Sequence, residues 1–201
     1  MSSTTLIKNN SGVTQVSLKA KFLGKRCVSI SGEINEESAL DFTDKILDLN
    51  LESNEPITVL INSNGGEINS GLLMYDAIVG SKAPIRMICR GKAYSMGAVL
   101  FACAKERYML PNSELMLHQP MLGGRVSGNA SSIKSISDSM LETKKKINKL
   151  LSKHTKKSEE EIDEATGFDH YFSPEESIEF NLCDEIIEFS KVIDFIKEVE
   201  W

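Results

Sequence analysis

Three side chains in the sequence have the types that nucleophilic catalysis by serine requires, namely Ser95, His118 and Asp169. A serine hydroxyl becomes a nucleophile when an imidazole accepts its proton, and a carboxylate usually orients the other nitrogen of that imidazole. The three residues lie far apart along the chain, so only the fold can bring them together.

Ser95 lies in a segment of mostly small residues, Gly91-Lys92-Ala93-Tyr94-Ser95-Met96-Gly97-Ala98, between a predicted strand and a predicted helix. A serine at such a turn exposes its hydroxyl, and the next N–H group points the same way near the positive end of the helix. The alternative is that Ser95 only caps the helix. This segment alone does not decide between a nucleophile and a cap.

A glycine pair, Gly65-Gly66, follows a predicted buried strand. Adjacent glycines can adopt left-handed backbone angles and expose their N–H groups. In a cleft, such donors stabilise a developing oxyanion. A plain strand-to-helix turn is the alternative, whereas a phosphate-binding P-loop is excluded because no Gly-Lys-Ser/Thr follows.

His118 ends an apolar run at residues 115–118, where a histidine can equally be an ordinary core residue. The other two histidines compete poorly, since His154 lies among lysines and His170 is next to Asp169. Asp169 precedes a well-capped helix, but the chain has 29 acidic residues, and spacing alone cannot choose the partner of the imidazole.

The elements that must position these residues alternate along the chain. Nearly continuous apolar runs predict strands at residues 27–30, 57–61, 85–89, 107–110 and 114–117. Helical spacing of apolar residues predicts helices after Asn35, after Gly66 and over residues 96–104, and a long amphipathic helix to about Lys153. Alternating strands and helices are typical of βαβ units, so the expected fold class is α/β with a largely parallel sheet.

The flanking regions give weaker signals. Residues 1–20 are polar and aperiodic and predict a flexible or partner-dependent arm. Two capping boxes, at Ser158 with Glu161 and at Ser173 with Glu176, predict helix starts. A strand at residues 185–189 and a helix at residues 192–201 complete the expected elements.

Composition excludes several classes of protein. The chain has 201 residues, of which 41% are hydrophobic and 26% charged, so it is globular rather than disordered. Its net charge of −6 disfavours nucleic acid and anionic membranes as partners. The start lacks the basic and apolar regions of a secretory signal. Four scattered cysteines predict reduced, buried thiols and a cytoplasmic location, with no zinc site.

Together these motifs resemble those of the Clp protease proteolytic subunit, the serine peptidase of ATP-dependent proteases. The similarity covers about residues 26–189 in the family's order and spacing. The segments that carry it are Ile61-Asn62-Ser63-Asn64-Gly65-Gly66, Tyr75-Asp76, Tyr94-Ser95-Met96-Gly97-Ala98, Leu110-Pro111-Asn112-Ser113, His118-Gln119-Pro120, Leu122-Gly123-Gly124 and Asp169 ahead of Ser173-Pro174-Glu175-Glu176.

The resemblance implies a serine endopeptidase with a catalytic triad. Ser95 would attack the scissile carbonyl, His118 would carry the proton, and Asp169 would orient the imidazole. The matching oxyanion donors are the backbone N–H groups of Gly66 and Met96. No metal or organic cofactor is implied.

The resemblance also implies a fold and an assembly. The fold is a crotonase-like α/β core at residues 26–201, preceded by an arm at residues 1–25 and bearing a handle helix at about 132–153. An extended polypeptide substrate would pair with strand edges near Ile68 and Leu122. Two stacked heptameric rings would enclose a chamber, supplied by an AAA+ ATPase of the Clp type, which uses the ATP.

Two other functions stay open at this point. Gly167-Phe168, Tyr94 and the start of the chain at residues 1–25 depart from the family pattern, which favours a catalytically weak or inactive ring subunit that partners an active paralogue. A crotonase-type enzyme acting on acyl-CoA shares the fold and a glycine-lined oxyanion hole. The chain is short for that role and lacks an evident glutamate pair at matching places.

Overall fold

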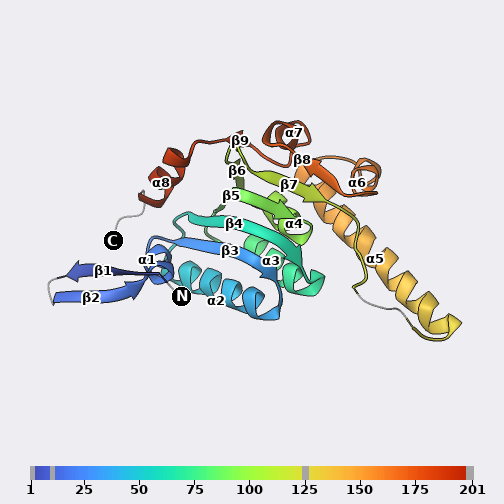
Figure 1. Ribbon diagram of the computed structural model, residues 1–201, viewed down its shortest axis with the longest axis horizontal. Coiled ribbons are helices and arrows are strands. Elements are labelled where there is room, and N and C mark those ends of the chain that lie inside the picture. The colour runs from blue at the N-terminus through green and yellow to red at the C-terminus, as the bar shows by residue number, and fades with distance from the viewer. Residues whose placement is uncertain (1–2, 10–11, 124–126, 198–201) are drawn as a thin grey trace.

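A mostly parallel sheet forms the centre of the molecule (Figure 1). The computed structural model describes residues 3–9, 12–123 and 127–197. In this part of the chain the sheet has the order β3-β4-β5-β6-β9, and β7 pairs with β5 and with β8. Its strands are β3 (Cys27–Ile34), β4 (Ile57–Gly66), β5 (Ile85–Tyr94), β6 (Glu106–Met109), β7 (Glu114–Leu117), β8 (His170–Phe172) and β9 (Glu185–Ile186).

Three helices connect the first strands and pack on one face of the sheet (Figure 1). They are α2 (Glu36–Glu52), α3 (Ile68–Gly80) and α4 (Met96–Ala102). The main hydrophobic core lies between these helices and the strands. A smaller cluster on Leu60 and Ile88 is covered by Val192 and Phe195 of α8 (Phe189–Lys197). Because both faces of the central strands are covered, their apolar runs are continuous.

The local signals in the sequence explain where the helices begin. Asn35 caps α2 and forms a capping box with Ser38. Capping boxes also start α6 (Glu159–Ala165) at Ser158 and α7 (Pro174–Glu179) at Ser173. These predicted helix starts and the five predicted strands are therefore confirmed, although β3, β4 and β5 end at residues 34, 66 and 94, well beyond their predicted ends.

The long helix α5 (Ala130–Thr155) extends away from the body of the molecule (Figure 1). It contains the predicted segment 132–153 and continues by two residues at each end. Its buried residues lie near its C-terminal end, at Ile147, Asn148, Leu151 and Thr155. Ile133 and Leu141 in the first half are 47% and 54% exposed.

Three regions differ from the sequence-based expectation. Residues 1–20, expected to be aperiodic, include an antiparallel hairpin of β1 (Thr4–Asn9) and β2 (Gly12–Ser17), followed by α1 (Leu18–Leu23). The hairpin side chains are largely exposed, so no buried face marked it in the sequence. The predicted strand at 185–189 shortens to β9, and α8 begins at Phe189; residues 198–201 of the predicted helix lie outside the described part. Strand β8 was not predicted, because its three residues depend on pairing with β7.

None of the helices in the described ranges combines the length and the apolar composition needed to cross a lipid bilayer.

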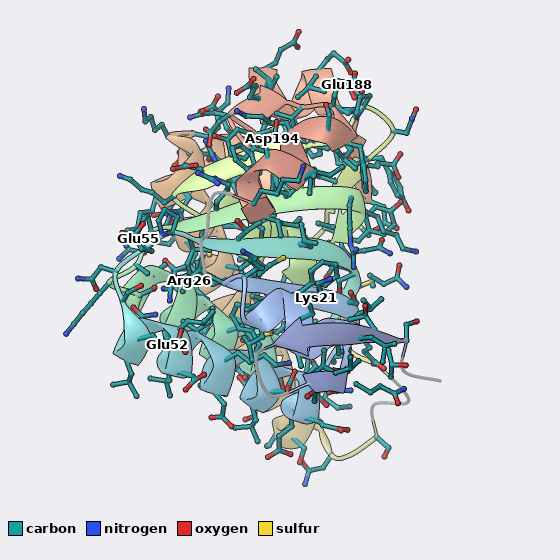
Figure 2. The ribbon with its side chains drawn as sticks, turned by 90° about the vertical axis from the view of Figure 1, so that its left-hand side faces the viewer. Lys21, Arg26, Glu52, Glu55, Glu188 and Asp194 are labelled. Carbon is teal, nitrogen blue, oxygen red and sulfur yellow. The ribbon has the colours of Figure 1, made fainter. Side chains whose placement is uncertain are left out.

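A buried arginine joins the end of α2 to the start of β3 (Figure 2). The guanidinium group of Arg26 donates hydrogen bonds to the backbone carbonyls of Leu49 at 3.0 Å, Ser53 at 3.1 Å and Glu55 at 3.0 Å. It also lies 3.5 Å from the exposed carboxylate of Glu52. The carbonyl of Leu49 also accepts the Ser53 N–H at 3.2 Å, and Ser53 and Glu55 follow the helix, so the arginine ties the last turn of α2 to the segment after it.

We expect Arg26→Ala to lower the free energy of unfolding by about 3 kcal/mol, because several carbonyls lose a charged donor in a buried place. Urea unfolding monitored by circular dichroism at one protein concentration measures the change. Arg90→Ala, at an exposed arginine, is the matched control. A loss for Arg26→Ala no larger than the control would contradict this role.

Candidate active site

Ser95 occupies a strained turn between β5 and α4. Its backbone angles are φ 53° and ψ −123°, a region that residues with a side chain rarely adopt. The Ser95 N–H donates to the carbonyl of Met116 at 2.8 Å, and the Ser95 carbonyl accepts from Ala98 at 3.0 Å and Val99 at 3.2 Å. Contacts on both sides thus maintain a conformation that costs about 1–3 kcal/mol.

The glycine pair at the end of β4 lies directly against this turn. Gly65 has φ +85°, and a Cβ there would lie 2.6 Å from the carbonyl oxygen of Tyr94 and 2.9 Å from Cβ of Ser95. Gly66 has φ +152°, and its Cβ would lie 2.1 Å from the carbonyl oxygen of Ile34. Both positions therefore require glycine, for steric as well as conformational reasons.

A buried serine fixes the path of the glycine pair. The hydroxyl of Ser63 accepts a hydrogen bond from the Gly65 N–H at 3.0 Å and donates one to the carbonyl of Gly32 at 2.6 Å. Ser63 also pairs with Ala93 of β5, beyond a register shift in the ladder. Strand β4 is thus held between β3 and β5 where the glycines begin.

The structure brings His118 and Ser95 together. His118 follows β7, and its Nε2 lies 2.6 Å from the Ser95 hydroxyl oxygen. The imidazole is only 10% exposed. Within the described part of the chain, its buried Nδ1 has no hydrogen-bond partner. The pair has the arrangement of a nucleophile and its base, with the second imidazole nitrogen unpaired.

Asp169 approaches the other side of the imidazole without bonding to it. Its Oδ1 lies 3.6 Å from Nδ1 of His118, which is longer than a hydrogen bond, and its side chain is 58% exposed. Two backbone features bring it near. Leu117 pairs with His170 in the β7–β8 ladder, and the Gln119 N–H donates to the carbonyl of Thr166 at 2.9 Å.

A cavity of about 340 Å³ opens beside Ser95 and His118. Most of its wall is apolar, including three methionines. The lining residues are Asn64, Gly66, Ile68, Ser95, Met96, Val99, Met116, His118, Gln119, Pro120, Met121 and Ile147. The wall suits an apolar ligand group.

Of the other four predicted site residues, three line this cavity and one does not. Gly66, Met96 and Ile68 line it. Met96 begins α4, where backbone N–H groups have no partner within the helix. Leu122 is 47% exposed and is not among the described residues that line the cavity.

Several lining residues were missed by the sequence analysis. Val99 and Met116 are close in sequence to Ser95 and His118, and this closeness could have predicted that they line the cavity. Ile147 comes from α5, and no local pattern could have assigned it to this cavity.

The cysteines are not competing nucleophiles. All four are free and buried, as the sequence predicted. Burial raises the pKa of Cys27 and Cys89 to about 12 and that of Cys183 to about 11. It raises the pKa of Cys103 too, so these thiols stay protonated and unreactive at neutral pH. Among the residues that the structure describes, no cluster of three His, Cys, Asp or Glu could hold a metal ion.

Comparison with known protein families identifies the family of the chain. A family model for Clp protease matches residues 10–190, which include the glycine pair, Ser95, His118 and Asp169. The chain belongs to the Clp protease family. The resemblance seen in the sequence is thereby confirmed, and the mostly parallel sheet with its helices agrees with the predicted crotonase-like α/β fold. Membership in the Clp protease family implies a peptidase with peptide substrates and oligomeric assembly.

The glycine pair leads to a prediction about stability. We expect Gly66→Ala to lower the free energy of unfolding by about 3 kcal/mol or more, because the new Cβ overlaps the backbone at an unfavourable φ. Gly80→Ala is the matched control, since a Cβ at Gly80 in the last turn of α3 meets no heavy atom within 4 Å. It should change stability by less than about 1 kcal/mol. Equal unfolding midpoints in urea for the two variants would contradict the packing described for Gly66.

Proposed function

We propose that the chain is a serine endopeptidase subunit that hydrolyses unfolded polypeptides. The observation that carries the proposal is the 2.6 Å distance from the Ser95 hydroxyl to Nε2 of His118, at a strained turn beside a cavity. A hydroxyl and an imidazole at this distance can exchange a proton, which is the first requirement of the reaction.

The chemistry proposed for these groups has two stages. His118 takes the proton of Ser95 as the hydroxyl oxygen bonds to the scissile carbonyl carbon, and the N–H groups of Gly66 and Met96 stabilise the oxyanion. His118 then gives the proton to the leaving amine, and an acyl-enzyme remains. A water molecule, deprotonated by His118, hydrolyses the acyl-enzyme and restores Ser95.

Asp169 is proposed to orient the imidazole during these steps. A shift of less than about 1 Å would bring its Oδ1 from 3.6 Å to hydrogen-bond distance of Nδ1 on His118. That shift would also satisfy a buried nitrogen that has no partner in the described part of the chain. The substrate is proposed to lie extended between Ile68 and Leu122.

We further propose assembly into two stacked heptameric rings served by an AAA+ ATPase of the Clp type. The support is family membership together with the exposed apolar residues of α5, Ile133 and Leu141. An apolar stripe on a projecting helix is stabilised when a neighbour covers it. Four free, buried thiols fit a reducing compartment, so the proposed location is the cytoplasm.

A second candidate is a catalytically weak ring subunit that needs an active paralogue. The specific observation in its favour is that Nδ1 of His118 has no hydrogen-bond partner among the described residues, with the exposed carboxylate of Asp169 at 3.6 Å. An inert homo-oligomer that supports peptide cleavage only when mixed with a companion subunit would favour this candidate.

Cleavage of a small fluorogenic peptide with an apolar residue before the scissile bond tests the leading proposal. We expect Ser95→Ala to remove the activity, with kcat falling on the order of 10⁴-fold or more, because no other hydroxyl replaces the nucleophile. Labelling by a serine-directed phosphonate should disappear in parallel. Ser190→Ala, at an exposed serine on α8, is the control and should cleave as the wild type does. Activity that survives Ser95→Ala would rule out the assigned nucleophile.

Assembly is tested by measuring solution mass and peptidase activity in the same fractions. We expect the wild-type chain to be oligomeric and Ile133→Glu to weaken association about tenfold or more, because a charge replaces an apolar side chain that the proposed assembly would bury. Ser135→Glu adds the same charge to an exposed position of the same helix and serves as the control. A monomeric wild type at working concentration would contradict the proposed rings.

A further inference from the structure

One tyrosine links the three strands that carry Ser95, His118 and Asp169. Tyr94 is the last residue of β5 and directly precedes Ser95. It pairs with Met116 of β7, and Met116 in turn pairs with Tyr171 of β8. The three strands are therefore adjacent at this level of the sheet.

The side chain of Tyr94 contacts both neighbouring strands. Its hydroxyl donates a hydrogen bond of 2.5 Å to the carboxylate of Glu114 on β7. Its ring meets the ring of Tyr171 edge to face, with centroids 5.7 Å apart and planes at 90°. Lys92 places its ammonium group 5.5 Å from the Tyr94 ring centroid. Charge-assisted hydrogen bonds and aromatic pairs are among the stronger side-chain contacts between strands.

The hydrogen bond also changes the acidity of the Tyr94 phenol. It is the main reason, ahead of burial, that the pKa of Tyr94 rises to about 12. The phenol therefore stays protonated at neutral pH and remains a donor to Glu114.

Each contact of Tyr94 lies close to a residue of the proposed triad. Glu114 begins β7, which leads directly to His118. Tyr171 stands two residues after Asp169. One phenol ring thus connects the element that carries the nucleophile to those that carry the base and the carboxylate.

Strand β8 has little backbone pairing of its own. It has three residues and pairs with β7 alone among the described strands. A strand this short has few hydrogen bonds to restrain it. Because the gap from Asp169 to His118 is 3.6 Å, a small displacement of β8 decides whether the two side chains bond.

We propose that Tyr94 is a positioning residue, which through Glu114 and Tyr171 holds β8, and with it Asp169, close enough to His118 for a small shift to form their hydrogen bond. The part of this inference that concerns turnover rests on the proposed peptidase function. The part that concerns the placement of β8 stands without it, so the two can fail separately.

Amide hydrogen exchange tests the placement of β8. We expect Tyr94→Ala to increase exchange of the amides of residues 170–172 at least about tenfold, with a smaller increase for Tyr94→Phe. Tyr108→Phe is the matched control, because the Tyr108 hydroxyl also donates to a glutamate, Glu106 at 3.3 Å, on strand β6. Unchanged exchange of β8 in Tyr94→Ala would overturn the proposal, whether or not the chain cleaves peptides.

Kinetics test the effect on the site. We expect Tyr94→Phe to lower kcat about three- to tenfold and Tyr94→Ala on the order of 100-fold, with KM nearly unchanged, since the defect lies in alignment and not in substrate binding. Tyr108→Phe should leave both constants at the wild-type values. A wild-type kcat in Tyr94→Ala, or a loss confined to KM, would overturn the positioning role.

Variants of Glu114 test its hydrogen bond with Tyr94. Glu114→Gln retains an acceptor oxygen and should keep most of the wild-type kcat, whereas Glu114→Ala should match Tyr94→Phe. The double variant Tyr94→Phe with Glu114→Ala should be no slower than either single variant, because both remove the same contact. Additive losses would contradict the link. A wild type that cleaves no peptide would refute the proposed function alone, and the exchange measurement would then decide the role of Tyr94.

Discussion

The close approach of two backbones, at Gly65 on β4 and at the Tyr94–Ser95 turn after β5, is the constraint on which the site depends. No side chain fits between them, since a Cβ on Gly65 would lie 2.6 Å from the carbonyl oxygen of Tyr94. This contact sets the glycine pair against the serine turn and helps to hold the serine at φ 53°. The parallel sheet supplies the rigidity, because β4 and β5 are central strands covered on both faces.

The two contacts of His118 differ because different parts of the fold support them. Ser95 and His118 both follow strands of the same parallel sheet, and their reacting atoms lie 2.6 Å apart. Asp169 belongs to a later unit made of α6, β8 and α7, joined to β7 by a short antiparallel ladder. Its carboxylate lies 3.6 Å from the imidazole. The nucleophile and base are thus set by the core of the fold, and the carboxylate by a peripheral addition.

Local sequence patterns predicted much of the fold, and within the site they pointed to Ser95 and the glycine pair. Strand runs, capping boxes and the small residues around Ser95 act over a few positions, so their elements were predictable. Asp169 could be chosen only through the family resemblance. Strand β8, the contact of Ile147 with the cavity and the link from Tyr94 to Glu114 all join segments distant in sequence. The hairpin of β1 and β2 escaped prediction for the opposite reason, because it buries little and leaves no alternating pattern.

The projecting helix α5 also has a mechanical meaning. With 26 residues and a rise of 1.5 Å per residue, it is a rod about 39 Å long. Only the C-terminal part of α5 packs against the body of the molecule, and Ile147 in that part lines the cavity. A displacement of the exposed end of α5 that tilts the whole helix would therefore also shift Ile147 and change the width of the cavity.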